Sequence, residues 1–152
     1  MKKIIQQSLE QAISYQDYKI LVSDLLARGK STGPDQSEAL TNYSLLNDKR
    51  MKRLDRTIKI LKQTKEVIQQ VKQKQTWLIL TEGWCGDAAQ NLPVINKMAE
   101  ENNNIDLKIV LRDDHLELMD LFLTHGARAI PKLIALDQEQ NVLYTYEGQG
   151  LR

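Results

Sequence analysis

The second half of the chain alternates short apolar runs with segments of helical periodicity. Runs of strand type occupy residues 77–80, 106–111, 132–136 and 142–146. Between them the spacing predicts helices over residues 88–101 and 115–125, the second closed by Gly126. The first two strands are joined through a helix, so we expect them to be parallel neighbours, and we expect the last pair to be antiparallel.

The first half has the pattern of helices. Ser14 and Asp17 have the spacing of a capping box, and they precede an amphipathic segment that should end at Gly29. Asp35 with Glu38 offers a second helix start. No proline or glycine occurs over residues 37–74, and an apolar stripe there favours one long helix, with a shorter helix near 38–46 ahead of it as the alternative.

Composition and charge narrow the class of protein. Hydrophobic residues make up 41% and charged residues 27% of the chain, as in soluble globular proteins. The net charge of +1 gives no overall attraction to nucleic acid or anionic membranes. The N-terminus lacks the continuous apolar core of a signal peptide, and no window is long enough for a membrane span. With a single cysteine, these features predict a cytoplasmic protein.

That single cysteine, Cys85, lies in the stretch TEGWCGDA between a predicted strand and a predicted helix. Its sulfur should therefore lie near free backbone N–H groups and the positive end of a helix dipole, which favours the thiolate and a pKa below that of free cysteine. Trp84 beside it offers an apolar platform to a partner. The alternative is that Cys85 is a small buried apolar residue.

A second marker is Pro131, which enters the apparent central strand at 132–136. Proline in a sheet is normally confined to the first residue of a strand or to an edge. A cis peptide bond between Ile130 and Pro131 would also explain its place here.

Together the two markers resemble the thioredoxin superfamily. The resemblance covers residues 76–147, about half of the chain: a W-C-G element between strand and helix, then an I-P pair that opens a strand before a hairpin. It implies an α/β fold with a central mixed sheet flanked by helices. It also implies that Pro131 is cis and adjoins Cys85, and that Ile130 contacts an extended substrate.

The sequence departs from that pattern around the cysteine. Where a dithiol thioredoxin has C-G-P-C, this chain has Cys85-Gly86-Asp87-Ala88, so Ala88 replaces the resolving cysteine. Asp87 disfavours a thiolate at Cys85, although an acid in the first helical turn is stabilising in its own right. The family's buried acid is missing from the preceding strand, and Glu82 is the nearest substitute.

The ends of the chain depart as well. We expect a helical extension over residues 1–74 and a thioredoxin-like core over 75–152, folded as one unit and without the closing C-terminal helix of the family. Either the chain is truncated there or the N-terminal helices cover the open face, since an uncovered face leaves an apolar patch. The whole chain resembles uncharacterised bacterial thioredoxin-like proteins with a helical extension and a W-C-G-D-A motif.

Charged residues elsewhere suggest further contacts. A basic run in the helical half is interpreted as a solvated face or a docking surface for an acidic partner, and nucleic-acid binding is disfavoured because no aromatics interleave it. It comprises Lys49, Arg50, Lys52, Arg53, Arg56, Lys59, Lys62 and Lys65. Arg128 would approach the thiol or an anionic substrate if Pro131 adjoins Cys85. His115 and His125 are interpreted as surface residues, and the sequence indicates no metal site and no cofactor.

Two functional hypotheses remain. In the first, the protein is a monothiol oxidoreductase whose Cys85 forms mixed disulfides with a protein or a low-molecular-weight thiol, and Trp84, Ile130 and Pro131 position the partner. In the second, it is a non-catalytic module that binds a peptide in the same groove.

Overall fold

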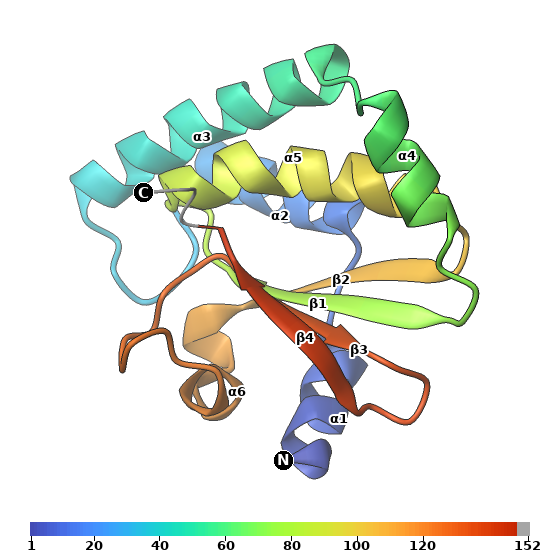
Figure 1. The fold of residues 1–152 in the computed structure, drawn as a ribbon. Coiled ribbons are helices and arrows are strands. Elements are labelled where there is room, and N and C mark those ends of the chain that lie inside the picture. The colour runs from blue at the N-terminus through green and yellow to red at the C-terminus, as the bar shows by residue number, and fades with distance from the viewer. Residues whose placement is uncertain (149–152) are drawn as a thin grey trace.

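A computed structural model describes residues 1–148 and places one mixed sheet between two layers of helices (Figure 1). The strands are β1 (Gln75–Thr81), β2 (Ile105–Leu111), β3 (Lys132–Leu136) and β4 (Val142–Glu147). They lie in the order β2-β1-β3-β4, with β1 parallel to β2 and antiparallel to β3, and with β3 antiparallel to β4. The predicted parallel first pair and antiparallel last pair are confirmed, and so is the thioredoxin-like α/β architecture.

Four helices precede the first strand in the sequence, and two more lie between strands. They are α1 (Lys2–Gln11), α2 (Tyr15–Ala27), α3 (Glu38–Thr57), α4 (Lys62–Gln69), α5 (Gly86–Glu100) and α6 (Leu116–Leu121), with a short 3-10 turn at Arg112–Asp114. Ser14 caps α2 as predicted, because its hydroxyl accepts the Asp17 N–H. The cap of α3 is Ser37, whose hydroxyl accepts the Leu40 N–H, and the predicted start at Asp35 lies before it.

The two faces of the sheet bury two apolar clusters. Side chains of α2, α3 and α5 pack on one face around Ile79 and Ile109, and those of α1 and α6 pack on the other around Leu78 and Leu80. Cys85 contacts both clusters because it lies at the edge where β1 ends. Within residues 1–148, no helix is long and apolar enough to cross a lipid bilayer.

The long helix expected over residues 37–74 is instead two helices. The chain is extended at Ile58 and at Leu61, which end α3 and begin α4. The break lets α4 approach the far end of α5, where the Asn102 amide donates to the carbonyl oxygens of Ile68 (2.8 Å) and Val71 (2.9 Å). Tertiary contacts therefore override a continuous apolar stripe that no proline or glycine interrupts.

The helix expected over 115–125 is also shorter. α6 ends at Leu121, and the chain turns at His125 and Gly126, which both have positive φ angles. This turn is closed by reciprocal backbone hydrogen bonds between Thr124 and Ala127. It replaces the last helical turn because the chain must reverse here to reach Pro131.

The hollow between α5 and the β3-β4 hairpin remains open. Its volume is about 430 Å³, and its wall includes Trp77, Met98, Leu133, Tyr144 and Tyr146. All six residues of β4 are exposed. The described N-terminal helices α2, α3 and α4 pack elsewhere, so they do not cover this hollow. Residues 149–152, where the sequence predicts no closing helix, lie outside the described residues.

Candidate functional site

Cys85 occupies the junction between β1 and α5. It is the N-cap of α5, with extended dihedral angles, and its own N–H donates to the Glu82 carbonyl oxygen at 3.1 Å. The thiol is half-buried and donates to the carbonyl oxygen of Ile130 at 3.5 Å. Strand end, turn and helix start thus hold one half-buried sulfur directly beside the loop that precedes β3.

The loop before β3 forms the second wall of the site. The peptide bond between Ile130 and Pro131 is cis, and both residues are buried. The structure therefore brings Cys85, Ile130 and Pro131 together from positions far apart in the sequence.

Gly148 forms the next part of that wall. Its N–H donates to the Pro131 carbonyl oxygen at 3.1 Å, and its own carbonyl oxygen accepts from the Asn91 amide at 2.8 Å. A Cβ at this position would lie 2.5 Å from the Pro131 Cγ, so the close approach of the two segments requires glycine.

The electrostatics of the thiol differ from the sequence-based expectation. Burial raises the pKa of Cys85 above its usual value, and the Asp87 carboxylate adds to this increase. The backbone N–H groups of Ala88 and Asp87, together with the Arg112 guanidinium, lower the same pKa but do not outweigh burial. The predicted pKa below that of free cysteine is therefore corrected: the helix start stabilises the thiolate, but desolvation of the sulfur has the larger effect.

Arg112, and not Arg128 as expected, is the arginine that lies beside the motif. Its guanidinium stacks over the Trp84 ring, 5.1 Å from the ring centroid, and pairs with Asp113 at 3.1 Å. The Arg128 guanidinium instead forms an exposed ion pair with Asp120 at 2.8 Å. A tuning role for Arg128 thus has no direct contact to support it, whereas the charge of Arg112 lowers the Cys85 pKa.

Glu82 lies behind the motif and is fully buried. One carboxyl oxygen accepts the Thr32 hydroxyl at 2.7 Å, and the other accepts the Asp113 N–H at 3.2 Å. Thr32 in turn accepts the Gly83 N–H at 2.9 Å. Burial raises the pKa of the Glu82 carboxyl, which these hydrogen bonds partly offset. Glu82 therefore ties the N-terminal segment to the turn that carries Cys85.

The N-terminal helices contribute to the same turn. The Asn47 amide of α3 donates to the Gly83 carbonyl oxygen at 3.2 Å. Three residues further along α3, an Arg50 guanidinium nitrogen lies 4.0 Å from the place a Cβ on Gly86 would occupy. The helical extension is thus a wall of the candidate site as well as a cover for the sheet.

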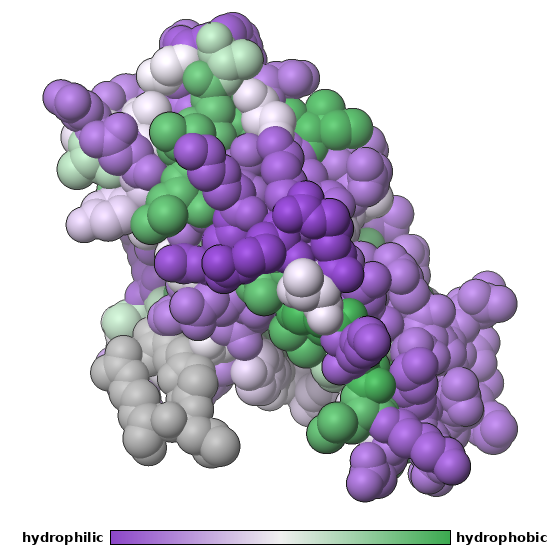
Figure 2. All heavy atoms as spheres, turned by 90° about the horizontal axis from the view of Figure 1, so that it is seen from above, coloured by the Kyte–Doolittle hydropathy of each residue, from purple (hydrophilic) through white to green (hydrophobic). Residues whose placement is uncertain are grey.

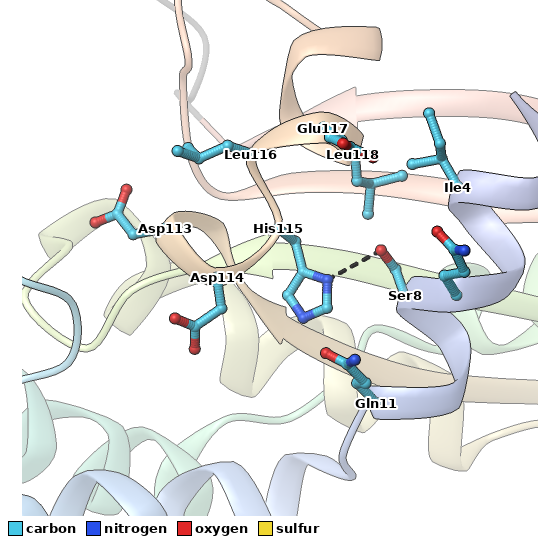
Figure 3. Close-up of a pocket in the computed structure, with 10 residues that line it drawn as sticks. Ile4, Ser8, Gln11, Asp113, Asp114, His115, Leu116, Glu117 and Leu118 are labelled. Carbon is cyan, nitrogen blue, oxygen red and sulfur yellow. Dashed lines mark hydrogen bonds between the residues drawn. The ribbon is translucent and has the colours of Figure 1, made fainter.

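A separate hollow of about 410 Å³ lies between α1 and the segment before α6 (Figure 3). The His115 ring points toward α1, where its Nδ1 is 3.0 Å from the Ser8 hydroxyl oxygen. Burial lowers the pKa of His115, which is half-buried, so its interpretation as a surface residue is corrected. Ser8 is only 4% exposed, and the pair serves as a link between α1 and α6.

Sequence patterns miss several residues of the site. Thr32, Asn47 and Arg112 come from helices and turns whose position relative to Cys85 depends on the tertiary fold, and Arg50 was expected only as part of the basic run. Gly148 carries a weak signal, since a glycine after the last strand is compatible with a close approach. Among residues 1–148, no three His, Cys, Asp or Glu side chains converge in a way that could hold a metal ion.

Comparisons with known proteins agree with the fold. A family model described as thioredoxin matches residues 33–148, more than half of the chain. A Pseudomonas aeruginosa protein of unknown function superposes with a TM-score of 0.60 at 18% identity, and an HIV epitope-scaffold with 0.59 at 19%. Each alignment covers 90% of this chain and 78% of the other, and shows likeness of fold alone. No curated protein matches the sequence.

Proposed function

The chain belongs to the thioredoxin family, and on that premise we propose that it is a monothiol exchange protein that forms persistent mixed disulfides through Cys85. The supporting observation is the place of the Cys85 sulfur at the start of α5, 3.5 Å from the Ile130 carbonyl oxygen and next to cis-Pro131. Ile130 presents backbone groups to an extended partner, and Trp84 presents an aromatic face.

The exchange needs two external thiols for each disulfide reduced. The Cys85 thiol loses its proton to solvent, and the thiolate attacks one sulfur of the substrate disulfide, whose S–S bond breaks and releases the first substrate thiolate. Ala88 has no thiol with which to resolve the resulting mixed disulfide. An external thiol therefore attacks the Cys85 sulfur and releases the second substrate thiol. A second external thiol then regenerates Cys85 and leaves the external disulfide.

A raised thiol pKa favours a long-lived mixed disulfide. It reduces the fraction of thiolate at neutral pH, which slows the first attack, but a more basic thiolate is intrinsically more nucleophilic. It also makes Cys85 a poor leaving group when an external thiol attacks the other sulfur of a mixed disulfide, as in the last step of regeneration, because thiols of lower pKa leave faster. Together with Ala88, this favours retention of a captured partner over rapid turnover.

Trapping of a mixed disulfide tests the proposal directly. The protein is incubated with a small disulfide, quenched with acid and analysed by mass spectrometry without reduction. We expect one adduct at Cys85, complete removal of the adduct by excess thiol, and no adduct in Cys85→Ser. A native protein that forms no adduct under conditions where its denatured chain does so would contradict thiol exchange.

The rate of alkylation against pH should report the environment of the sulfur. We expect a midpoint above that of the denatured chain, because burial raises the Cys85 pKa. Asp87→Asn should lower the midpoint and accelerate alkylation near neutral pH by about twofold to fivefold, the effect of an exposed charge. Glu100→Gln, at the other end of α5, is the matched control and should have no effect. A native midpoint below that of the denatured chain would contradict this account.

A non-catalytic peptide-binding module is the second candidate. The raised pKa of Cys85 and the carboxylate of Asp87 favour it, since both disfavour a reactive thiolate. It would use the same groove beside Trp84, Ile130 and Pro131. A peptide that binds Cys85→Ser as tightly as the wild type, combined with no adduct in the trapping experiment, would favour this candidate.

A further inference from the structure

Arg50 is a cation beside the candidate site. Its side chain is half-buried on α3, with a guanidinium nitrogen near Gly86, the residue after Cys85. Within residues 1–148, no carboxylate lies in ion-pair range of it. Asp87, which follows Gly86 in the motif, is exposed and does not pair with Arg50. Because no described residue forms an ion pair with it, the guanidinium can bind a carboxylate of a bound partner.

Apolar side chains continue from Arg50 along α3. Tyr43 and Leu46 lie seven and four residues before Arg50, on the same side of the helix, and are 57% and 52% exposed. In the space-filling view from above, apolar groups interrupt an otherwise hydrophilic surface (Figure 2). A surface of this kind, with aromatic and aliphatic groups next to one arginine, has the composition of a protein contact. The surface formed by Tyr43, Leu46 and Arg50 is too long for a small thiol bound at Cys85 to cover.

We propose that Tyr43, Leu46 and Arg50 form a specificity surface for a peptide segment whose reactive cysteine is flanked by acidic residues. This inference rests on the proposed thiol exchange at Cys85 and names the partner of that site. In this arrangement the sulfur of the substrate cysteine faces Cys85, and a neighbouring carboxylate of the peptide pairs with Arg50. The remainder of the peptide covers Tyr43 and Leu46. A guanidinium recognises a carboxylate in a bidentate geometry.

The test uses short peptides whose cysteine is activated as a mixed disulfide with a neutral thiopyridine. Attack by the Cys85 thiolate on the peptide sulfur releases the thiopyridine, whose absorbance gives the rate. Three peptides differ only in the residues that flank the cysteine, which are Glu, Gln or Lys. We expect the Glu peptide to react about fivefold faster than the Gln peptide, and the Lys peptide to react slowest. The differences should shrink at high salt.

Arg50→Gln should remove this preference without abolishing the reaction. The matched control is Arg56→Gln, which removes the same charge from a different side of α3, and it should retain the preference. Loss of preference in both variants, or in neither, would overturn the role of Arg50. The rate of each peptide is divided by its rate with a free thiol, which corrects for differences in intrinsic reactivity.

Two further outcomes separate the inference from the proposed function. Equal rates with all three peptides would refute the specificity surface but leave thiol exchange intact, whereas no release from any of them would refute exchange and the inference with it. A mixed disulfide of glutathione should react more slowly than the Glu peptide, and Tyr43→Ala should slow the peptides but not the glutathione substrate. If the Glu peptide and the glutathione mixed disulfide react at equal rates, Arg50 recognises a small acidic thiol, and the proposed peptide partner is wrong.

Discussion

Replacing Ala88 with cysteine is expected to shorten the lifetime of a Cys85 mixed disulfide by about 100-fold or more. Position 88 is three residues after Cys85, and its backbone N–H already contacts the sulfur. A thiol there would attack the Cys85 sulfur from within the molecule, expel the bound partner and close an internal disulfide between positions 85 and 88. Well-oriented intramolecular reactions proceed as though the reactant were present at very high concentration, which an external thiol does not match.

The measurement is release of a labelled thiol from the mixed disulfide in the absence of any reductant. Ala88 is 1% exposed, so an added sulfur also strains the core, with a cost of about 1 to 3 kcal/mol. Ala88→Ser adds a group of similar size without a thiol and should leave the lifetime unchanged. If folded Ala88→Cys releases the label no faster than Ala88→Ser, the mixed disulfide does not sit beside position 88, and persistence of the wild-type adduct needs another cause.

Sequence patterns were sufficient for the part of the fold whose signals are local. The apolar runs located all four strands, and the helix after the first strand predicted its parallel pairing with the second. The motif at Cys85 and the proline at 131 carried the family resemblance, because they stand in a recognisable order and spacing relative to the predicted strands and helix. These features follow from residues close together in the chain, or from a known order of strands.

The expectations that failed depend on tertiary contacts. The break between α3 and α4 has no glycine or proline to mark it, and Asn102 holds α4 against the end of α5 from more than thirty residues away. The Cys85 pKa depends on how deeply the sulfur is buried, and a helix start alone predicts the opposite direction. Arg112 displaces Arg128 as the nearby cation for the same reason: sequence proximity to Pro131 does not fix where a long side chain points.

Glu82 is a residue of the candidate site that the sequence indicates, but its environment could not be predicted from the sequence. The sequence placed an acid near Cys85, while the structure buries it completely and satisfies both oxygens. Its partners come from the turn after α2 and the turn after β2. A buried carboxyl of this kind couples the N-terminal extension to the motif, so its loss should affect the stability of the whole fold.

Glu82→Ala is expected to lower the free energy of unfolding by about 2 to 4 kcal/mol, because it leaves a cavity and removes the acceptor for Thr32 and Asp113. Glu82→Gln keeps the volume and should cost far less. The Glu82 pKa is raised in the folded state, so that state binds the proton more tightly than the unfolded chain. This contribution to stability is present at low pH and is lost as pH rises from the usual glutamate value through the folded one.

Urea unfolding of wild type and both variants at about pH 5 and about pH 8 measures these effects. The wild type should lose stability relative to Glu82→Gln as pH rises, because the amide has no proton to release, while Glu82→Ala should remain the least stable at both values. Gly148→Ala serves as a control that strains the site without altering this carboxyl, so its stability difference from wild type should not change with pH. A wild type that gains stability over Glu82→Gln on going to pH 8 would mean that the folded protein favours the charged carboxylate. In that case the hydrogen bonds from Thr32 and Asp113, and not burial, would dominate the energetics of Glu82.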